Sequence, residues 1–379
     1  MADSNYKIEN LDSYKVGGGE CEIYLGDVKL YPLDSPVPPT PHDYSSDYLT
    51  ITALGDGEIS WRGNQNTSNK LSYSTDSGQT WTTPYSSIFS VNVQRGDKVL
   101  FKGNCTVPYS NDGIGVFRSS VYPQNLNFNV EGNVMSLLYG DDFSGQTSIT
   151  SMTHTFQSLF SGSSVVDAEN LVLPATALSR CCYHGMFSNC TSLTKAPSVL
   201  PADTLEFQCY LYMFSGCTSL VQPPQLQAST MADSSCAFMF VGCTSLQTAP
   251  QLSATTLAEE CYNYMFMNCT SLTTAPALPA TTLEHACYQD MFYNCTSLTT
   301  APTLPAPILA DYCYASMFLN CYNLSSITCL ATDISAENCT NGWVISVSSS
   351  GTFTKDPNMT DWTRDTNGIP SNWTIQNYS

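Results

Sequence analysis

The sequence has little charge, and positive charge is especially scarce. Only 12% of its 379 residues are charged, and 13 Lys and Arg stand against 32 Asp and Glu, which gives a formal net charge of −19. A field of this sign repels phosphate backbones and anionic lipids, so no nucleic acid partner is expected. Ser, Thr, Asn and Gln replace the missing charges, which indicates a surface rich in hydroxyl and amide groups.

Long apolar runs are also missing. No stretch approaches the ~20 apolar residues needed to cross a bilayer, so no membrane insertion is expected. Residues 1–20 contain no apolar run between a basic start and a small-residue cleavage site, and no secretory signal is predicted there. If Met1 is the natural start, the protein is expected to fold in a cytoplasm.

Paired metal-ligand motifs are lacking as well. The 17 cysteines include no C-x-x-C pair and the histidines show no ligand spacing, so neither a metal nor another cofactor is predicted. The four histidines are His42, His154, His184 and His285. Cys181, Cys182 and His184 resemble a thiol nucleophile with its base, but no third orienting group is evident, so packing is the favoured interpretation. No catalytic residue is predicted.

The dominant feature that is present is an internal repeat marked by the dipeptide Met-Phe. Its copies are Met186-Phe187, Met213-Phe214, Met239-Phe240, Met265-Phe266, Met291-Phe292 and Met317-Phe318, with Leu159-Phe160 as a degenerate first copy. The period of 26 or 27 residues lies in the range of leucine-rich repeats and predicts a stacked array.

Each repeat is predicted to contain one short helix and one short strand. Leu283, Cys287, Met291 and Cys295 recur every four residues, which is typical of one apolar face of a helix. Residues 296–305 then read as extended chain that ends in a proline-marked turn. Strands stack about 4.8 Å apart, whereas helices need about 10 Å each, so the array is expected to curve with its strands on the concave side.

A proline recurs at one position of the strand segment. The residues are Pro197, Pro224, Pro250, Pro276 and Pro302. Because proline cannot donate to a strand ladder, the sheet is predicted to be narrow and confined to the residues just before it.

Twelve cysteines fall on two positions of the repeat. One ladder is Cys182, Cys209, Cys236, Cys261, Cys287 and Cys313, and the other is Cys190, Cys217, Cys243, Cys269, Cys295 and Cys321. On one helix the members of a pair would lie about 11 to 12 Å apart, too far for a disulfide. Neighbouring helices would also hold them too far apart. The cysteines are therefore predicted to be free, buried packing residues.

The unit Met-Phe-x-Asn-Cys-Thr-Ser-Leu-Thr-Thr-Ala-Pro-x-Leu-Pro-Ala, seen at 265–280 and 291–306, resembles the BspA-like leucine-rich repeats. Such repeats are common in surface proteins of gut Bacteroidetes and occur in their phages. The resemblance covers about residues 133–340. It implies a solenoid that binds other proteins, matrix or glycans, and it implies no catalysis.

The N-terminal third divides into three segments. Residues 1–31 are predicted to be a small attachment segment with a hairpin, because about 30 residues cannot bury a core alone. Residues 32–47 are predicted to be a stiff proline-rich linker. Residues 48–132 alternate like short strands separated by turns, which predicts a β-sandwich.

A single hairpin in this β-domain resembles the Asp-box of sialidases and related β-proteins. Its matching residues are Ser74, Asp76, Gly78, Thr80 and Trp81. In that family the box is a structural turn in which the aspartate bonds loop amides and the tryptophan packs below. A sialidase site also needs an arginine cluster, and the sequence has only Arg62, Arg95, Arg118, Arg180 and Arg364. An enzyme is therefore disfavoured.

Residues 341–379 are predicted to cap the last repeat, because a solenoid must cover its terminal apolar face. Exposed strand residues are the candidates for ligand binding, although a merely soluble face is at least as good an interpretation. This predicted strip consists of Lys195, Gln222, Gln247, Thr248, Thr273, Thr274, Thr299 and Thr300.

Together these features favour a non-enzymatic structural and recognition protein of a phage virion: a head or tail fibre or a decoration protein. Residues 1–31 would bind a virion anchor protein, and the solenoid would bind a host surface protein or glycan. The alternative is a BspA-type adhesin at the bacterial cell surface, anchored through the same residues, and a glycan-active enzyme is less favoured. A homo-oligomer is left open, since no heptad run supports the trimer common among fibres.

Overall fold

The computed structural model describes residues 13–17, 20–25, 28–29, 42–62, 70–86, 88–104, 120–122, 126–150 and 153–379. The chain forms two compact units, Met1–Asp43 and Tyr44–Ser379. The first contains an antiparallel sheet of β1 (Ser13–Gly17), β2 (Glu20–Leu25) and β3 (Val28–Lys29), in that order. This is the region where a hairpin was predicted, while linker residues 32–41 lie outside the described residues.

The second unit begins with two sheets. The larger one has the order β11-β10-β4-β8-β6, and β12 also pairs with β10; the smaller has the order β7-β5-β9. The strands of the larger sheet are β4 (Leu49–Ala53), β6 (Leu71–Ser74), β8 (Lys98–Gly103), β10 (Phe128–Asn133), β11 (Val165–Asp167) and β12 (Leu171–Val172). Those of the smaller are β5 (Gly57–Arg62), β7 (Ile88–Val93) and β9 (Ser120–Tyr122). Trp61 of β5 contacts Phe101 of β8, with 5.1 Å between ring centroids.

The larger sheet continues into the repeats. β10 pairs antiparallel with β4 on one side and parallel with β11 and β12 on the other. The predicted separate β-sandwich over residues 48–132 is therefore not confirmed, because one of its sheets also receives the first strands of the solenoid. The helical segments described in this part of the chain are short. η1 (Tyr44–Ser46) precedes β4, and α1 (Ser136–Tyr139) and η2 (Gly140–Asp142) lie between β10 and β11.

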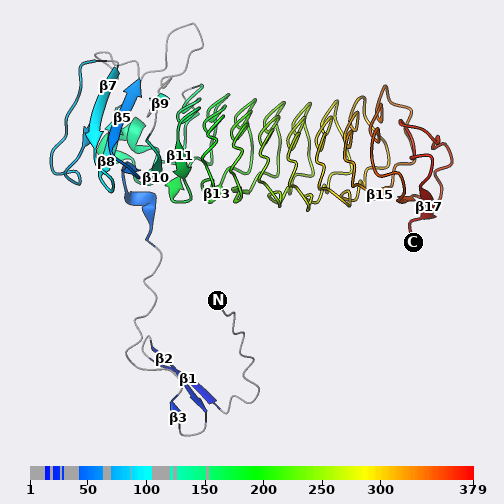
Figure 1. The fold of residues 1–379 in the computed structure, drawn as a ribbon, viewed down its shortest axis with the longest axis horizontal. Coiled ribbons are helices and arrows are strands. Elements are labelled where there is room, and N and C mark those ends of the chain that lie inside the picture. The colour runs from blue at the N-terminus through cyan, green and yellow to red at the C-terminus, as the bar shows by residue number, and fades with distance from the viewer. Residues whose placement is uncertain are drawn as a thin grey trace. The chain divides into compact units, whose positions relative to one another are not determined.

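The repeats form a β-solenoid whose coils stand side by side between β11 and β17 (Figure 1). Strands within the coils are short: β13 (Val199–Leu200), β14 (Gln225–Leu226), β15 (Ser326–Cys329), β16 (Thr352–Lys355) and β17 (Thr374–Asn377). α1, with four residues, is the only α-helix in the described part of the chain, so the predicted helix in each repeat is wrong. None of the helices described there is long and apolar enough to span a membrane.

Successive turns replace the predicted helix. In one coil Glu260, Tyr264 and Asn268 have φ of 54°, 56° and 62°, a left-handed conformation that an α-helix of L-residues cannot contain. Turn bonds such as Met265 N–H to Tyr262 C=O (3.2 Å) alternate with bonds to the next coil, such as Phe266 N–H to Met291 C=O (2.9 Å). The repeat of apolar residues every four positions is thus the period of the turns.

Both sides of each coil bond directly to the next coil. The turn segment does so through alternate amides, and the strand segment through parallel bridges such as Thr248 with Thr274 and Thr300 with Ser326. The Thr248, Thr274 and Thr300 bridges lie just before the prolines, as predicted. Pairing also occurs after the prolines, at β13 with β14 and at the Leu304–Cys329 bridge, so the predicted confinement of the sheet is wrong. Coil spacing is therefore about 4.8 Å on both sides, and the predicted curvature loses its cause, in keeping with the nearly straight row of coils in Figure 1.

The core consists of side chains stacked from coil to coil. Phe266 lies between Phe240 and Phe292, with ring centroids 5.6 and 5.7 Å away. All fifteen cysteines between Cys181 and Cys339 are free and buried, which confirms their predicted packing role. In the second ladder each thiol also donates to a phenylalanine carbonyl of the preceding coil, for example Cys295 Sγ to Phe266 O at 3.1 Å.

The first cysteine ladder contains one error of register. Cys236 N–H donates to Cys261 O, just as Tyr210 N–H donates to Ser235 O, so Cys236 occupies the tyrosine position and Ser235 the cysteine position. The physical reason is the spacing to the Met-Phe pair: Cys236 precedes Met239 by three residues, whereas the other ladder members precede their methionine by four.

The turn pattern continues past residue 340. Trp343 O accepts a bond from Phe318 N–H (2.9 Å), as Met317 O accepts one from Phe292 N–H (3.0 Å). β15, β16 and β17 form a parallel sheet. The buried Trp343 and Trp373 indoles donate to the carbonyls of Gly368 and Ser348, so this segment packs apolar rings on the last coils.

Candidate ligand-binding face of the solenoid

The residues of the predicted strip lie in register on neighbouring coils. Parallel bridges join Lys195 to Gln222, Thr248 to Thr274 and Thr300 to Ser326. Lys195 is half-buried, and the other seven members, Gln222, Gln247, Thr248, Thr273, Thr274, Thr299 and Thr300, are exposed. The structure thus brings these side chains together along the solenoid, and their role in binding stays a prediction.

The one cation of the strip is already paired. Lys195 Nζ lies 2.6 Å from Glu169 Oε2 and 3.6 Å from Asp167 Oδ2, and Gln222 Nε2 donates to Glu169 Oε1 at 3.0 Å. The hydrogen bond with Glu169 is the main cause of the raised pKa of Lys195, and it lowers the pKa of Glu169. The strip therefore offers hydroxyl and amide groups and no free cation.

Charge is absent from the part of the strip that follows Gln222. The chain segments 244–257, 270–283 and 296–310 carry the six strip residues from Gln247 to Thr300 and the last three prolines of the row, and contain no Asp, Glu, Lys, Arg or His. Carboxylates appear directly after them, at Glu259, Glu284 and Asp311. In a protein with a net charge of −19, three successive coils thus share one neutral, hydroxyl-rich face.

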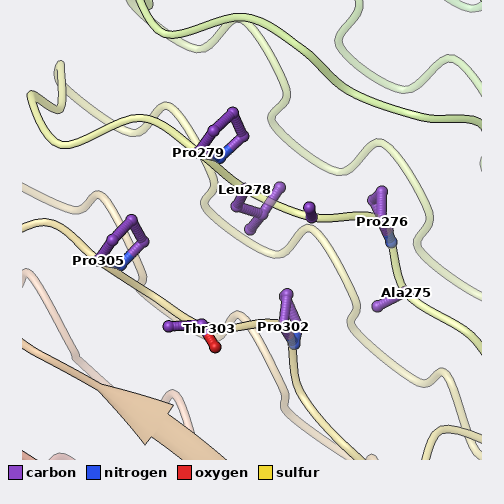
Figure 2. A pocket seen from close by; sticks show the side chains of 8 residues that line it. Ala275, Pro276, Leu278, Pro279, Pro302, Thr303 and Pro305 are labelled. Carbon is purple, nitrogen blue, oxygen red and sulfur yellow. The ribbon is translucent and has the colours of Figure 1, made fainter.

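A shallow groove of about 470 Å³ crosses this neutral face between two coils. In Figure 2 the rings of Pro276 and Pro279 stand on one coil and those of Pro302 and Pro305 on the next, with Leu278 and Thr303 between them. No backbone hydrogen bond joins segment 275–279 to segment 302–305. Its lining residues are prolines, alanines, a leucine and a threonine. None of them is charged, so the groove is suited to an uncharged group.

The groove was not predicted as a site. The sequence feature that coincides with it is a second proline three residues after the repeated proline, at Pro279 and Pro305. The corresponding stretch three coils earlier lacks this pair and instead forms β13 and β14, which hydrogen-bond to each other.

The Asp-box residues form a closed turn in the β-domain. Asp76 accepts bonds from Thr80 N–H (2.9 Å), Thr80 Oγ1 (2.6 Å) and Ser74 Oγ (2.7 Å). The Thr80 bonds are the main cause of a pKa of about 2 for Asp76. Trp81 Nε1 donates to Gly78 O (3.1 Å). An aspartate held in its ionised form by its own loop is unsuited to proton transfer at neutral pH.

Cys182 and His184 do not have the electrostatic properties of a thiol nucleophile and its base. Cys182 is completely buried, and burial raises its pKa to about 12, whereas reactive thiols have lowered values. His184 has a lowered pKa, mainly through burial. Within the described ranges no group of three or more His, Cys, Asp or Glu side chains is placed to hold a metal ion.

Comparisons with known proteins add little. No family model and no curated protein matches the sequence. A crystal structure of a leucine-rich repeat protein from Bacteroides ovatus is similar over 62% of this chain and 70% of that one, at 14% identity and a TM-score of 0.27.

Proposed function

We propose that this chain is a non-enzymatic recognition protein whose solenoid binds an uncharged ligand through the neutral face. The observation that carries the proposal is the union of the strip, in register on successive coils, with a 470 Å³ proline-lined groove. A ligand without charge avoids both the desolvation of ions and repulsion by the carboxylates beyond the face. A neutral glycan or an uncharged patch of a host surface protein meets this description.

The proposed setting is a phage virion, as a head or tail fibre or a decoration protein. Residues 1–31 would attach to a virion protein, which is supported by their membership of a compact unit distinct from the solenoid unit. The repeat resemblance to BspA-like proteins supports the alternative, an adhesin at the bacterial cell surface. Antibodies against the protein distinguish these settings: purified virus particles bind them in the first, and intact uninfected bacteria in the second.

Ligand binding by the neutral face is tested with substitutions that keep the core. The quadruple variant T273R/T274R/T299R/T300R places bulky charges on exposed positions, and T360R/T366R adds the same side chain at exposed positions in the C-terminal segment. Both proteins and the unchanged chain are applied to a panel of neutral and acidic oligosaccharides and matrix proteins. The quadruple variant is expected to lose binding and the control to keep it; equal binding by all three contradicts the assignment.

A further inference from the structure

A second surface lies on the turn segments of the solenoid. Tyr212, Phe238 and Tyr264 occupy the same position on three successive coils and stack with ring centroids 4.7 and 4.6 Å apart. All three are partly exposed, Tyr212 by 37%. We call this stack the aromatic ridge.

The backbone at the ridge disfavours aromatic residues. Tyr212, Phe238 and Tyr264 each have φ of 56°, a conformation that costs a bulky residue about 1 kcal/mol or more. The same position in other coils is filled by small or short polar residues in the same conformation: Ser158, Gly185, Asp290, Ser316 and Gly342. The fold therefore does not require rings here, and three adjacent exceptions indicate a purpose other than coil formation.

Polar groups close both ends of the ridge. The ring of His184 lies 5.9 Å from that of Tyr212. At the other end the Tyr264 hydroxyl is hydrogen-bonded to Asp290, and the negative charge of Glu260 lies close enough to affect it. Burial is the main cause, with these two carboxylates, of a pKa of Tyr264 raised to about 12. The ridge thus ends against two carboxylates.

Carboxylates also stand at the start of the turn segments that carry the ridge, and they recur on the coils that follow. Residues 196–354 contain no Lys or Arg. Exposed acidic side chains recur just before or at the start of the turn segments: Glu206, Asp233, Glu259, Glu284, Asp311 and Glu337, with Glu260 half-buried beside them. Among them, Glu259 Oε1 lies 3.2 Å from His285 Nδ1. We call this row the acidic edge.

We infer that the aromatic ridge and the acidic edge together bind a basic protein surface, one that presents arginine or lysine beside apolar side chains. Guanidinium groups combine stacking on aromatic rings with bidentate bonds to carboxylates, and both acceptors lie together here. A second copy of this chain, with its net charge of −19, and nucleic acids are repelled by the same field. The surface belongs to the turn segments, so it does not depend on the strip or the groove.

The inference is tested with the full chain and a twelve-residue peptide of alternating arginine and leucine, followed by fluorescence anisotropy at 150 mM salt. The variant Y212S/F238S/Y264S places at the ridge a residue that two other coils already use, and it is expected to bind at least tenfold more weakly. The control Y322S removes a 55% exposed tyrosine elsewhere and is expected to bind unchanged. If the triple variant fails to fold, peptide binding is measured with the single variant F238S instead.

A matched pair of charge variants separates a local site from attraction by net charge. E259Q/E260Q and E58Q/D361N each remove two negative charges, on the acidic edge and at distant positions respectively. The edge variant is expected to weaken binding at least threefold and the distant one less than twofold. Equal loss in both, or unchanged binding by the ridge variant, overturns the inference. Preferential capture of a neutral oligosaccharide at the ridge would overturn it too.

Discussion

Chemical modification of the cysteines tests the stacked core directly. Burial raises the pKa of Cys190, Cys321 and Cys329 from 9.0 to about 12. Only the thiolate reacts, and three pKa units correspond to about a thousandfold less thiolate at pH 8. With an aromatic disulfide reagent in excess, these thiols are expected to react at least about a thousandfold more slowly than in unfolded protein.

The assay compares release of the coloured thiol from native protein and from protein in 6 M guanidinium. The background variant C21S/C105S leaves the fifteen buried cysteines as the reporters. Cys181 and Cys339 are expected to react first, because burial raises their pKa less and encloses them less completely. Prompt reaction of six or more thiols in the native state would refute the stacked core, since a ladder cannot be buried and reagent-accessible together.

Three further predictions concern stability. Phe266→Ala removes a fully buried ring from the stack and is expected to cost about 3–5 kcal/mol, seen as a lower guanidinium midpoint, whereas Tyr322→Ala at an exposed site leaves the midpoint unchanged. Asn294 has φ of 60° and its side chain donates to Asn268 Oδ1 at 2.8 Å. Both Asn294→Val and Asn294→Gly lose that bond, but only glycine keeps the left-handed turn without strain, so the valine variant is expected to have the lower Tm; equal effects would contradict the left-handed turn. Asp76 has a folded pKa of about 2, below its unfolded value, so its stabilisation is complete above the unfolded pKa and is lost as the pH falls towards 2. The Tm difference between the protein and Asp76→Asn should disappear over that range, and a constant difference would contradict it.

The repeat register was predictable from the sequence, whereas the local conformation was not. A fixed period of 26 or 27 residues places Thr274 beside Thr248 and Thr300 whatever the shape of the coil, so the strip could be assembled without a structure. The predicted helix was wrong because apolar residues spaced by four are compatible, over a short segment, both with an α-helix and with successive four-residue turns. Over Leu283 to Cys295, however, an α-helix drifts by about 40° every four residues, and a strict spacing of four therefore favours turns.

Other features depended on details that an average repeat conceals. The error at Cys236 follows from aligning cysteines instead of counting back from Met239. The aromatic ridge is visible in the residue before each Met-Phe pair, which is Gly185 in one coil and Tyr212 in the next. The groove could not be predicted, because it depends on which inter-coil bonds are absent between segments 275–279 and 302–305.

Direct bonding between coils on both sides has a consequence for how such a molecule changes length. Each coil bonds to its neighbours through the same alternate amides of the turn segment, so a whole unit inserted between Cys269 and Cys295 would leave the β-domain and the terminal tryptophans undisturbed. Every added unit would extend the reach by about 4.8 Å and widen the neutral face by one more row of threonines. Duplication of a 26-codon unit in the gene would therefore increase the length of the solenoid and the area of its neutral face together.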